Sequence, residues 1–560
     1  MSNESILELT LGGFQVFAEP VTFPLGPITL LFGPNSAGKS AIADALLVLK
    51  GFAALFNDGA RNSESEILQE AASLLESHWR LEPGAPPMRA PEVQLGIRIR
   101  VARDSWADEA VAKKSFTANE YGVSERFKSA FAAIEPWLAS EEFVDLDLRL
   151  RFSRGEEGHF HDEETVPSEL AGFHLKLDIS LAGIPILQSE RQGRVALQTA
   201  HPIFGGRLNT SAYQRLAARD PDKYWLKDGW FGFELAASLS SDGLDAGPLT
   251  IWVENDDESA YSACVEFADF FDAIWLSSIR TVRRFANLTS VPASRSIPSL
   301  HEVTYLKAAD GRDIAGNRFG LRIEGRPEFD SLATCGLLTK LNSEREGAPP
   351  GPQEGHQALD TVNRHLAEHM FREKGYFVRT EVNRLAAIRP DERLLIHTTP
   401  GQLRDPDGYL VTLTLEDPEG RRFAFDEVGS GLGYVLPVLA ALASPRMTFI
   451  QQPELHLHPA LQAELADALV DGAGQTRQDI VETHSEHLLL RILRRVRQTS
   501  AGTVNLELRI EADDLCVVYF DPQPNGTTNV KRLRVSEDGD FVDRWPRGFF
   551  TERDEDLFGE

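Results

Sequence analysis

Hydrophobic and polar residues follow two different periods along this chain, and each period predicts a different kind of element. Apolar and polar residues alternate over 6–17, 93–101, 144–152 and 173–181, which predicts half-buried strands because successive strand side chains point to opposite faces. Residues 28–32 are apolar except for Thr29, as expected of a buried strand. With residues 6–17 and 21–27, they predict one small sheet at the start of the chain.

A period of three to four residues marks the predicted helices. Apolar residues recur at this spacing over 42–49, 461–469 and 489–496. Strands and helices interleave, which indicates an α/β protein, and residues 57–257 read as a mixed, largely β segment within it. Further helices are expected over 63–77, 124–135, 260–271, 331–341 and 357–372.

The composition is that of a globular protein without disulfides. The chain has 560 residues, of which 42% are hydrophobic and 25% charged, and its net charge of −28 argues against a large nucleic-acid-binding face. Cys264, Cys335 and Cys516 lie too far apart for a disulfide framework or a zinc module. There is no signal-peptide pattern, and the most apolar run, 434–443, is too short to span a bilayer. We expect a soluble, cytoplasmic protein with no membrane association.

One short stretch carries the clearest chemical signal. Between the strand at 28–32 and the helix at 42–49, the chain fits G-x-x-x-x-G-K-[ST], the phosphate-binding P-loop. The backbone N–H groups of such a loop surround phosphate oxygens at a positive helix N-terminus. Lys39 would reach the outer phosphates of a nucleotide, and the Ser40 hydroxyl would bind Mg²⁺. The expected cradle consists of Gly33, Pro34, Asn35, Ser36, Ala37, Gly38, Lys39 and Ser40.

Three further motifs follow in the last third of the chain. A Gly-Ser-Gly turn at 429–431 opens an apolar helix, and helix N-termini attract anions. An apolar strand over 447–450 runs into Gln451-Gln452-Pro453-Glu454. A second apolar strand, over 479–481, leads into Glu482-Thr483-His484 and another helix.

In this order the motifs resemble the head of an ABC-type ATPase, with its P-loop, signature turn, Walker B strand, D-loop and switch histidine. The chain is more closely similar to the bacterial AAA/ABC-class ATPases related to the OLD (overcoming lysogenisation defect) group, through residues 31–40, 428–438, 453–462 and 482–491. The resemblance implies an α/β fold: an ABC-type P-loop ATPase head with a large mixed α+β insertion and a small C-terminal domain. It says little about residues 55–385.

We therefore expect a head that is interrupted along the chain. Its N-terminal part, with the P-loop, would span 1–56, and the largely β insertion 57–257. The chain would return to the ATPase core over 258–300 and form a helical subdomain over 301–385. The rest of the head would span 386–500, and the small C-terminal domain 501–560.

The resemblance implies a composite site for ATP and Mg²⁺. In such heads, ATP lies between the P-loop of one subunit and the signature turn of another. Gly429, Ser430 and Gly431 would then contact a γ-phosphate bound by Lys39 of a second copy. One chain carries each motif once, so this geometry requires a homodimer or a higher even oligomer. His484 would contact the γ-phosphate as the switch residue, or else be a hydrogen-bonded histidine at a helix start.

The chain departs from the family at the end of the Walker B strand. The family has an acidic residue there that orients Mg²⁺, followed by a glutamate that activates water, whereas this chain has Gln451 and Gln452. A neutral amide cannot accept a proton as a general base, so these positions predict slow hydrolysis with intact binding. Glu454 is a candidate for the missing carboxylate. Either the enzyme is slow, or a partner completes the site, or one glutamine was introduced to trap ATP.

Several other residues allow two interpretations. Phe14 or Phe17 could stack on an adenine, although core positions are favoured. The basic residues of 280–284 could contact phosphate or pair with local acids. The arginines of 491–497 could contact DNA, although a solvated helix face is favoured. His456, His458, His484 and His487 could bind a metal ion, although a D-loop is favoured.

We expect a dimeric ATP-binding ABC-type ATPase that works as a nucleotide-driven switch and controls a separate effector protein, in bacterial defence against phages or plasmids. OLD nucleases carry a TOPRIM domain after the head, but no convincing acidic metal cluster follows His484, which disfavours an intrinsic nuclease. One alternative is a non-hydrolysing ATP sensor or scaffold. A DNA-repair ATPase is another, although nucleic-acid binding is not indicated by the charge.

Overall fold

The computed structural model divides the chain into two compact units, and each is built from non-contiguous segments. Unit 1 comprises residues 1–26, 33–288 and 518–532, and unit 2 comprises 27–32, 289–517 and 533–560. The structure describes residues 4–54, 71, 73–82, 88–102, 142–154, 173–189, 194–198, 214–215, 217–218, 221, 224–227, 230–234, 278, 281–282, 288–295, 304–307, 354–372, 374–385, 408–425, 427–443, 447–473 and 477–546.

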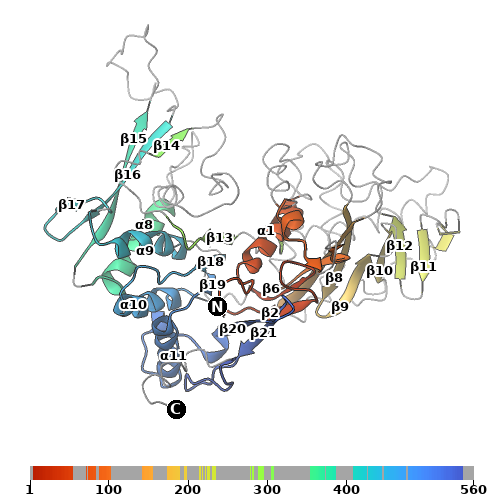
Figure 1. Cartoon of the computed structure of the whole chain (residues 1–560). Helices are drawn as coiled ribbons and strands as arrows, with labels where there is room; N and C mark the ends of the chain where they lie inside the picture. Colours follow the sequence, from red (N-terminus) through yellow and green to blue (C-terminus); the bar gives the residue numbers. More distant parts are fainter. Residues whose placement is uncertain are drawn as a thin grey trace, which may run out of the picture. The chain divides into compact units, whose positions relative to one another are not determined.

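Unit 1 contains a nine-stranded antiparallel sheet of order β11-β12-β10-β9-β8-β7-β6-β1-β2 (Figure 1). The three long strands expected from alternation at 93–101, 144–152 and 173–181 are confirmed as β6, β7 and β8. The strands are β1 (Ser5–Gly12), β2 (Val21–Pro24), β6 (Glu92–Ala102), β7 (Phe143–Arg154), β8 (Phe173–Leu181), β9 (Ile184–Ser189), β10 (Arg194–Gln198), β11 (Tyr224–Lys227) and β12 (Trp230–Glu234).

The alternation in β6 explains how this sheet forms. Val93, Leu95 and Ile99 are fully buried on one face. On the other face, Arg100 Nε donates to Asp145 Oδ1 of β7 at 2.7 Å. Burial alone would raise the pKa of Asp145, but the hydrogen bonds from Arg100 and Arg98 outweigh it and lower that pKa. Unit 1 also holds α1 (Ala41–Ala54), which follows the P-loop, and the short pair β4 (Leu81–Glu82) and β5 (Met88–Arg89).

Unit 2 contains a sheet in which β13 (Leu288–Val291), β18 (Met447–Gln451), β19 (Gln478–Glu482) and β3 (Ile28–Phe32) are successive neighbours, and β18, β19 and β3 pair in parallel. Gln451 is in register with Glu482, and Glu482 with Leu31, so β18, β19 and β3 end at one edge. Among the described residues of this part, α8 (Glu354–Glu368) lies beside α9 (Ser430–Leu442), and α10 (Pro459–Val470) lies beside α11 (Glu486–Ser500) (Figure 1).

The remaining elements of unit 2 are mostly antiparallel strands. β14 (Thr304–Lys307), β16 (Gly408–Glu416) and β15 (Phe377–Leu385) form a separate sheet, which β17 (Arg422–Phe423) joins through β16. Two short helical turns, η6 (Leu506–Leu508) and η7 (Ala512–Asp514), precede β20 (Leu515–Pro522). Along β20 the chain returns to unit 1, where β21 (Thr528–Leu533) follows.

One prediction about the start of the chain is wrong. The segments 6–17 and 21–32 do not form one small sheet: β1 and β2 pair antiparallel, whereas β3 lies in the parallel sheet. The physical reason is visible in the sequence. All five residues of β3 are buried, which suits the centre of a parallel sheet covered on both faces.

The helix expected at 357–372 is confirmed as α8, with earlier bounds, and the helix of 63–77 is described only over its last residues. The helices expected at 124–135, 260–271 and 331–341 and the arginines of 280–284 lie outside the described residues. Among the described helices, none is long and apolar enough to cross a membrane.

Candidate functional site

The P-loop, residues 33–40, directly follows β3 and has the backbone shape that its sequence requires. Gly33, Ser36 and Gly38 have φ angles of 140°, 61° and 89°. A side chain at Gly33 or Gly38 would also meet its neighbours, because a Cβ would lie 2.5 Å from the carbonyl oxygen of Phe520 or 2.3 Å from Cγ2 of Val16. Both glycines are therefore needed for conformation and for space.

Lys39 is folded into this loop. Its side chain is buried, and Nζ donates to the carbonyl oxygens of Gly33 at 3.0 Å and Pro34 at 2.8 Å. Pro34, Asn35 and Ser36 form the exposed rim, while Ser40 is half-buried and its carbonyl accepts the first hydrogen bonds of α1. A buried ammonium inside a ring of main chain at a helix N-terminus is suited to a phosphate group.

Two side chains of unit 1 hold the first turn of α1, the helix that follows the P-loop. Gln15 Nε2 donates to Asp44 Oδ2 of α1 at 2.9 Å, and His78 Nε2 lies 3.4 Å from the same oxygen. Phe14 and Phe17 are both buried, and Phe17 packs edge-on against Phe23. The two phenylalanines are therefore core residues rather than surfaces for an adenine.

The Walker B segment, which we define as residues 451–454, begins where β18 ends. Gln452 has a φ of 44°, and its N–H donates to the carbonyl oxygen of Glu482 at 2.7 Å. Gln451 accepts a long hydrogen bond of 3.4 Å from Ala293 N, and its Nε2 lies 3.5 Å from Glu482 Oε2. The Gln451 amide, which replaces the expected carboxylate, thus lies beside the carboxylate of Glu482 on the neighbouring strand β19.

Glu454 holds the segment that carries His484, the predicted switch histidine. One of its oxygens accepts from Thr483 Oγ1 and the other from His484 N, both at 2.8 Å. Ser485 then caps α11, because its Oγ accepts from Leu488 N at 3.0 Å. Glu454 therefore positions His484, which is half-buried.

The predicted signature turn, residues 429–431, lies directly against the predicted D-loop, residues 456–459. Gly429 is the N-cap of α9, and the backbone of Ser430 begins the helix. A Cβ on Gly431 would lie 3.1 Å from the carbonyl oxygen of His456. The ring of His456 stacks on Tyr434 of α9, with 4.2 Å between the ring centroids.

Arg295 joins these pieces, and the sequence analysis did not identify it. Its side chain is only 3% exposed, and its Nε donates to the carbonyl oxygen of Tyr434 at 2.8 Å. Its two terminal nitrogens donate to four more carbonyl oxygens, those of Pro292, Gln451, Gln452 and Pro453, at 3.0–3.2 Å. All donors of the guanidinium are thereby paired with main chain of α9, the end of β13 and the Walker B segment.

Arg295 remains charged although it is buried. Burial lowers the pKa of Arg295 to about 10, while the charges of Glu454 and Tyr434 act in the opposite direction. The guanidinium is therefore protonated at neutral pH and keeps its full set of donors. No local pattern around residue 295 indicates this role, since its partners lie up to 158 positions away.

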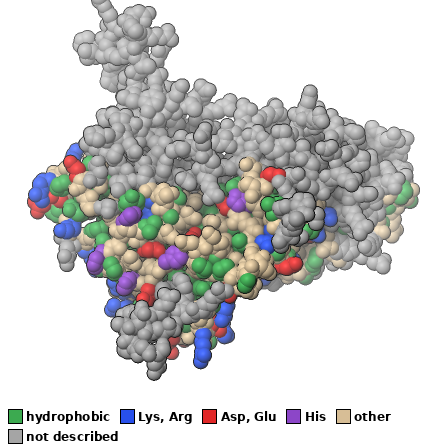
Figure 2. Space-filling view, in the orientation of Figure 1, with side chains coloured by type: hydrophobic (Ala, Val, Ile, Leu, Met, Phe, Trp, Pro, Cys, Tyr) green, Lys and Arg blue, Asp and Glu red, His purple; other side chains and the backbone are tan. Residues whose placement is uncertain are grey.

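Within unit 2 the structure thus brings together Gly431, Gln451, Gln452, Glu454 and His484, whereas the P-loop residues belong to unit 1. His456 and His458 are exposed, and Figure 2 shows histidine side chains at the surface in the part of the view that α9 to α11 occupy. In the part of the chain that the structure describes, no group of His, Cys or acidic side chains that could share an ion includes the D-loop histidines.

Comparison with known proteins now becomes informative. Residues 339–491 match the family model described as "AAA domain, putative AbiEii toxin, Type IV TA system". The matched range contains the signature turn, the Walker B segment and His484. It supports an ABC/AAA-type P-loop ATPase fold of the α/β class, as expected. No match names the OLD group, so that relation stays a prediction, and no curated protein matches the chain in sequence.

Solved structures with similar arrangements include heads of SMC proteins. The SMC head bound to the C-winged helix domain of ScpA is 11% identical, with a TM-score of 0.36 over 95% of this chain and 98% of that chain. The SMC head domain from Thermotoga maritima is 10% identical, with a TM-score of 0.33 over 95% of this chain and 100% of that one. The Smc head domain from Pyrococcus furiosus bound to the C-terminal domain of ScpA is 11% identical, with a TM-score of 0.33 over 95% of this chain and 96% of that chain. TM-scores this low support no residue-level argument.

Proposed function

We propose that this protein is an ATP-binding, ABC-type ATPase that works as a dimeric, nucleotide-driven switch. The observation that carries the proposal is the P-loop itself: its glycines adopt the positive-φ backbone that curls main-chain N–H groups inward, and Lys39 lies buried within it. The AAA-domain match over 339–491, a segment of the chain that does not include the P-loop, supports the same class independently.

ATP and Mg²⁺ fit the chemistry of the residues present. Gly33 and Gly38 have no room for a Cβ and keep the positive φ angles that a phosphate-binding loop requires, and Lys39 supplies a cation for the outer phosphates. Mg²⁺ prefers oxygen ligands, which the Ser40 hydroxyl and the Gln451 amide oxygen offer. Bound Mg²⁺ would neutralise phosphate charge. Neither side chain is anionic, so each would contribute less charge to the binding of the ion than a carboxylate would.

The proposed dimer follows from the motif count. One chain has one P-loop and one signature turn, so Gly429–Gly431 would meet a nucleotide held by a second copy of the chain. A homodimer, or a higher even oligomer, then forms when ATP binds. In this arrangement bound ATP holds the two copies together. The dimer would then be the form that acts on a separate effector protein, in defence against phages or plasmids.

Slow turnover is part of the proposal. Gln451 and Gln452 cannot act as general bases, and both oxygens of Glu454 already accept hydrogen bonds from the His484 segment. We therefore assign Glu454 to positioning His484, and His484 to sensing the γ-phosphate. Gln452 would orient the attacking water without taking its proton.

The test of binding and dimerisation uses full-length protein, ATP and Mg²⁺. We expect wild type to bind ATP and to shift from monomer to dimer in sedimentation velocity. Lys39→Ala should lose at least about 100-fold in affinity, which corresponds to about 2.7 kcal/mol. Lys531→Ala, which removes an exposed lysine of β21 outside the P-loop, is the matched control and should bind as wild type does. Equal binding by wild type and Lys39→Ala would contradict the proposal.

A second candidate is a sensor or scaffold that binds ATP without hydrolysing it. The observation in its favour is the pair Gln451 and Gln452 at the end of β18. In that case ATP alone holds the dimer, and no phosphate is released over many hours. Phosphate release by wild type that disappears in Lys39→Ala would exclude the sensor and retain the ATPase.

A further inference from the structure

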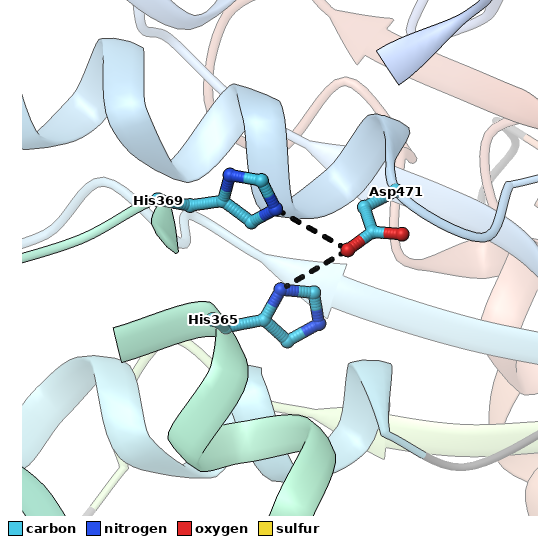
Figure 3. Close-up of side chains that lie close together, drawn as sticks. All are labelled: His365, His369 and Asp471. Carbon is cyan, nitrogen blue, oxygen red and sulfur yellow. Dashed lines mark hydrogen bonds and ion pairs between the residues drawn. The ribbon is translucent and has the colours of Figure 1, made fainter. Parts of the chain in front are cut away.

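A buried cluster of two histidines and one aspartate lies away from the motifs of the ATPase. His365, in the last turn of α8, and His369, one turn further on, are four residues apart and so share a face. Asp471 is the C-cap of α10. All three side chains are buried, and their ligand atoms lie within 4.8 Å of one another. Figure 3 shows both imidazole rings directed at the same carboxylate oxygen.

The distances match those between the ligands of one small cation. His369 Nε2 lies 3.2 Å from Asp471 Oδ2, and His365 Nδ1 lies 3.6 Å from it. With metal–ligand bonds of about 2.0–2.1 Å, two ligands of a tetrahedral Zn²⁺ are separated by about 3.3 Å. Imidazole nitrogen and carboxylate oxygen are ligands that Zn²⁺ accepts.

His365 gives a second, independent indication of a ligand. Both of its ring nitrogens are fully buried, and among the described residues neither has a hydrogen-bond partner. A buried polar atom without a partner costs free energy, so such atoms are rare unless an ion or a water satisfies them. Burial also lowers the pKa of His365, against the pull of Asp471, and a neutral imidazole is the form that binds metal.

From this geometry we infer that His365, His369 and Asp471 form a structural Zn²⁺ site that joins α8 to the end of α10. Three protein ligands and one water complete the tetrahedron. The backbone of Asp471 is held in place, because Arg477 Nη2 donates to its main-chain carbonyl oxygen at 3.0 Å. The inference goes beyond the proposed ATPase and does not depend on it.

Arg364 competes with the ion for Asp471. Its Nη1 forms a close ion pair with Asp471 Oδ2, and the same nitrogen lies 3.6 Å from Glu368 Oε2. The Arg364 side chain is 37% exposed, so it can turn away from Asp471 and keep Glu368 as its partner when Zn²⁺ arrives. Asp471 is thus neutralised by Arg364 or by the metal, and removing Arg364 favours the metal.

The experiment is Zn²⁺ binding to full-length protein that has been stripped with a chelator and desalted. Bound zinc is counted by mass spectrometry, its affinity comes from competition with a chromophoric chelator, and Co²⁺ reports the geometry by its visible absorption. We expect about one ion per chain and a tetrahedral Co²⁺ spectrum. His369→Gln and Asp471→Asn should weaken binding by at least about 100-fold, and Arg364→Gln should strengthen it by about tenfold.

The matched control is His487→Gln, which removes an exposed histidine outside the cluster and should bind Zn²⁺ as wild type does. Circular dichroism and thermal melting check that each variant is folded, and two ligand variants guard against the failure of one. Zinc binding that is absent in wild type overturns the inference. So does binding that is equally tight in folded His369→Gln and Asp471→Asn, because the ion then sits on surface histidines.

Discussion

The P-loop and the Walker B segment are both short loops after buried strands, but they are held in shape in different ways. In the P-loop, the conformation is set by its own glycines and by Lys39, whose ammonium binds carbonyl oxygens five and six positions back. The Walker B segment is held by Arg295, from more than 150 positions away. The residues that shape the P-loop can therefore be read from its own sequence, whereas the residue that holds the Walker B segment in place gives no local sign.

The largest loss of stability is expected on removal of Arg295, which tests whether the Walker B segment is held by this remote residue. Arg295→Met removes every donor to five carbonyl oxygens and should lower the free energy of unfolding by about 3–4 kcal/mol, because buried acceptors lose their partners. Urea denaturation measures the loss. Arg295→Lys keeps the charge but has fewer donors, so an intermediate loss is expected. An unchanged unfolding midpoint for the methionine variant would show that the Walker B segment is held locally.

A smaller loss of stability is expected in the P-loop and tests whether its own glycines set its conformation. Gly38→Ala places a Cβ against Val16 at a φ of 89° and should cost about 2–3 kcal/mol. Gly429→Ala is the matched control, because nothing lies within 4 Å of its added Cβ. Thermal melting of the two variants should therefore differ clearly. Equal melting would mean that the P-loop backbone is not constrained by its glycines.

The link between the Walker B segment and the switch histidine is weaker still. Glu454→Gln replaces a charged acceptor with a neutral amide that has only one oxygen, and should cost about 1–2 kcal/mol. Thr483→Val removes one of the same bonds and should lose part of that stability. A double-mutant cycle by urea denaturation measures the coupling. Additive losses would contradict the direct contact between the two residues.

The smallest effect concerns the buried cluster and depends on pH. Because burial holds the pKa of His365 below its unfolded value of about 6.5, its contribution is fully present above that value and is lost as pH falls through it. At pH 5.5 the loss should be about 1.4 kcal/mol relative to pH 7.5. Asp471 favours the protonated ring, while Arg477, Arg364 and His369 oppose it. In chelator-treated His365→Gln this part of the pH dependence should be missing.

The difference between local and remote determinants also explains which elements could be predicted from the sequence. The P-loop, β3 and α1, the signature helix α9, β18 and the helices α10 and α11 follow from hydrophobic period and short motifs, since each is encoded within about 15 residues. Pairing between remote segments is not encoded that way. The sequence therefore placed β3 in the wrong sheet and contained no local sign of Arg295 or of Asp471 as the partner of His365 and His369.

The two histidines of that cluster show where a signal was present. His365 and His369 have the i, i+4 spacing of paired ligands on a helix, but their third partner comes from the end of α10, 102 positions later. The spacing of His456 and His458 suggested a metal site instead, but both side chains are exposed. Spacing within one element indicates a ligand pair only once the fold supplies the remaining ligand.

The most direct test of the central account is phosphate release from saturating ATP by wild type, Gln451→Glu, Gln452→Glu and Lys39→Ala. The account predicts that wild type binds ATP but turns it over slowly, that Gln452→Glu is faster by at least about tenfold, and that Lys39→Ala is inactive. Rapid turnover by wild type, unchanged by either glutamate, would contradict it, because another residue would then be activating the water.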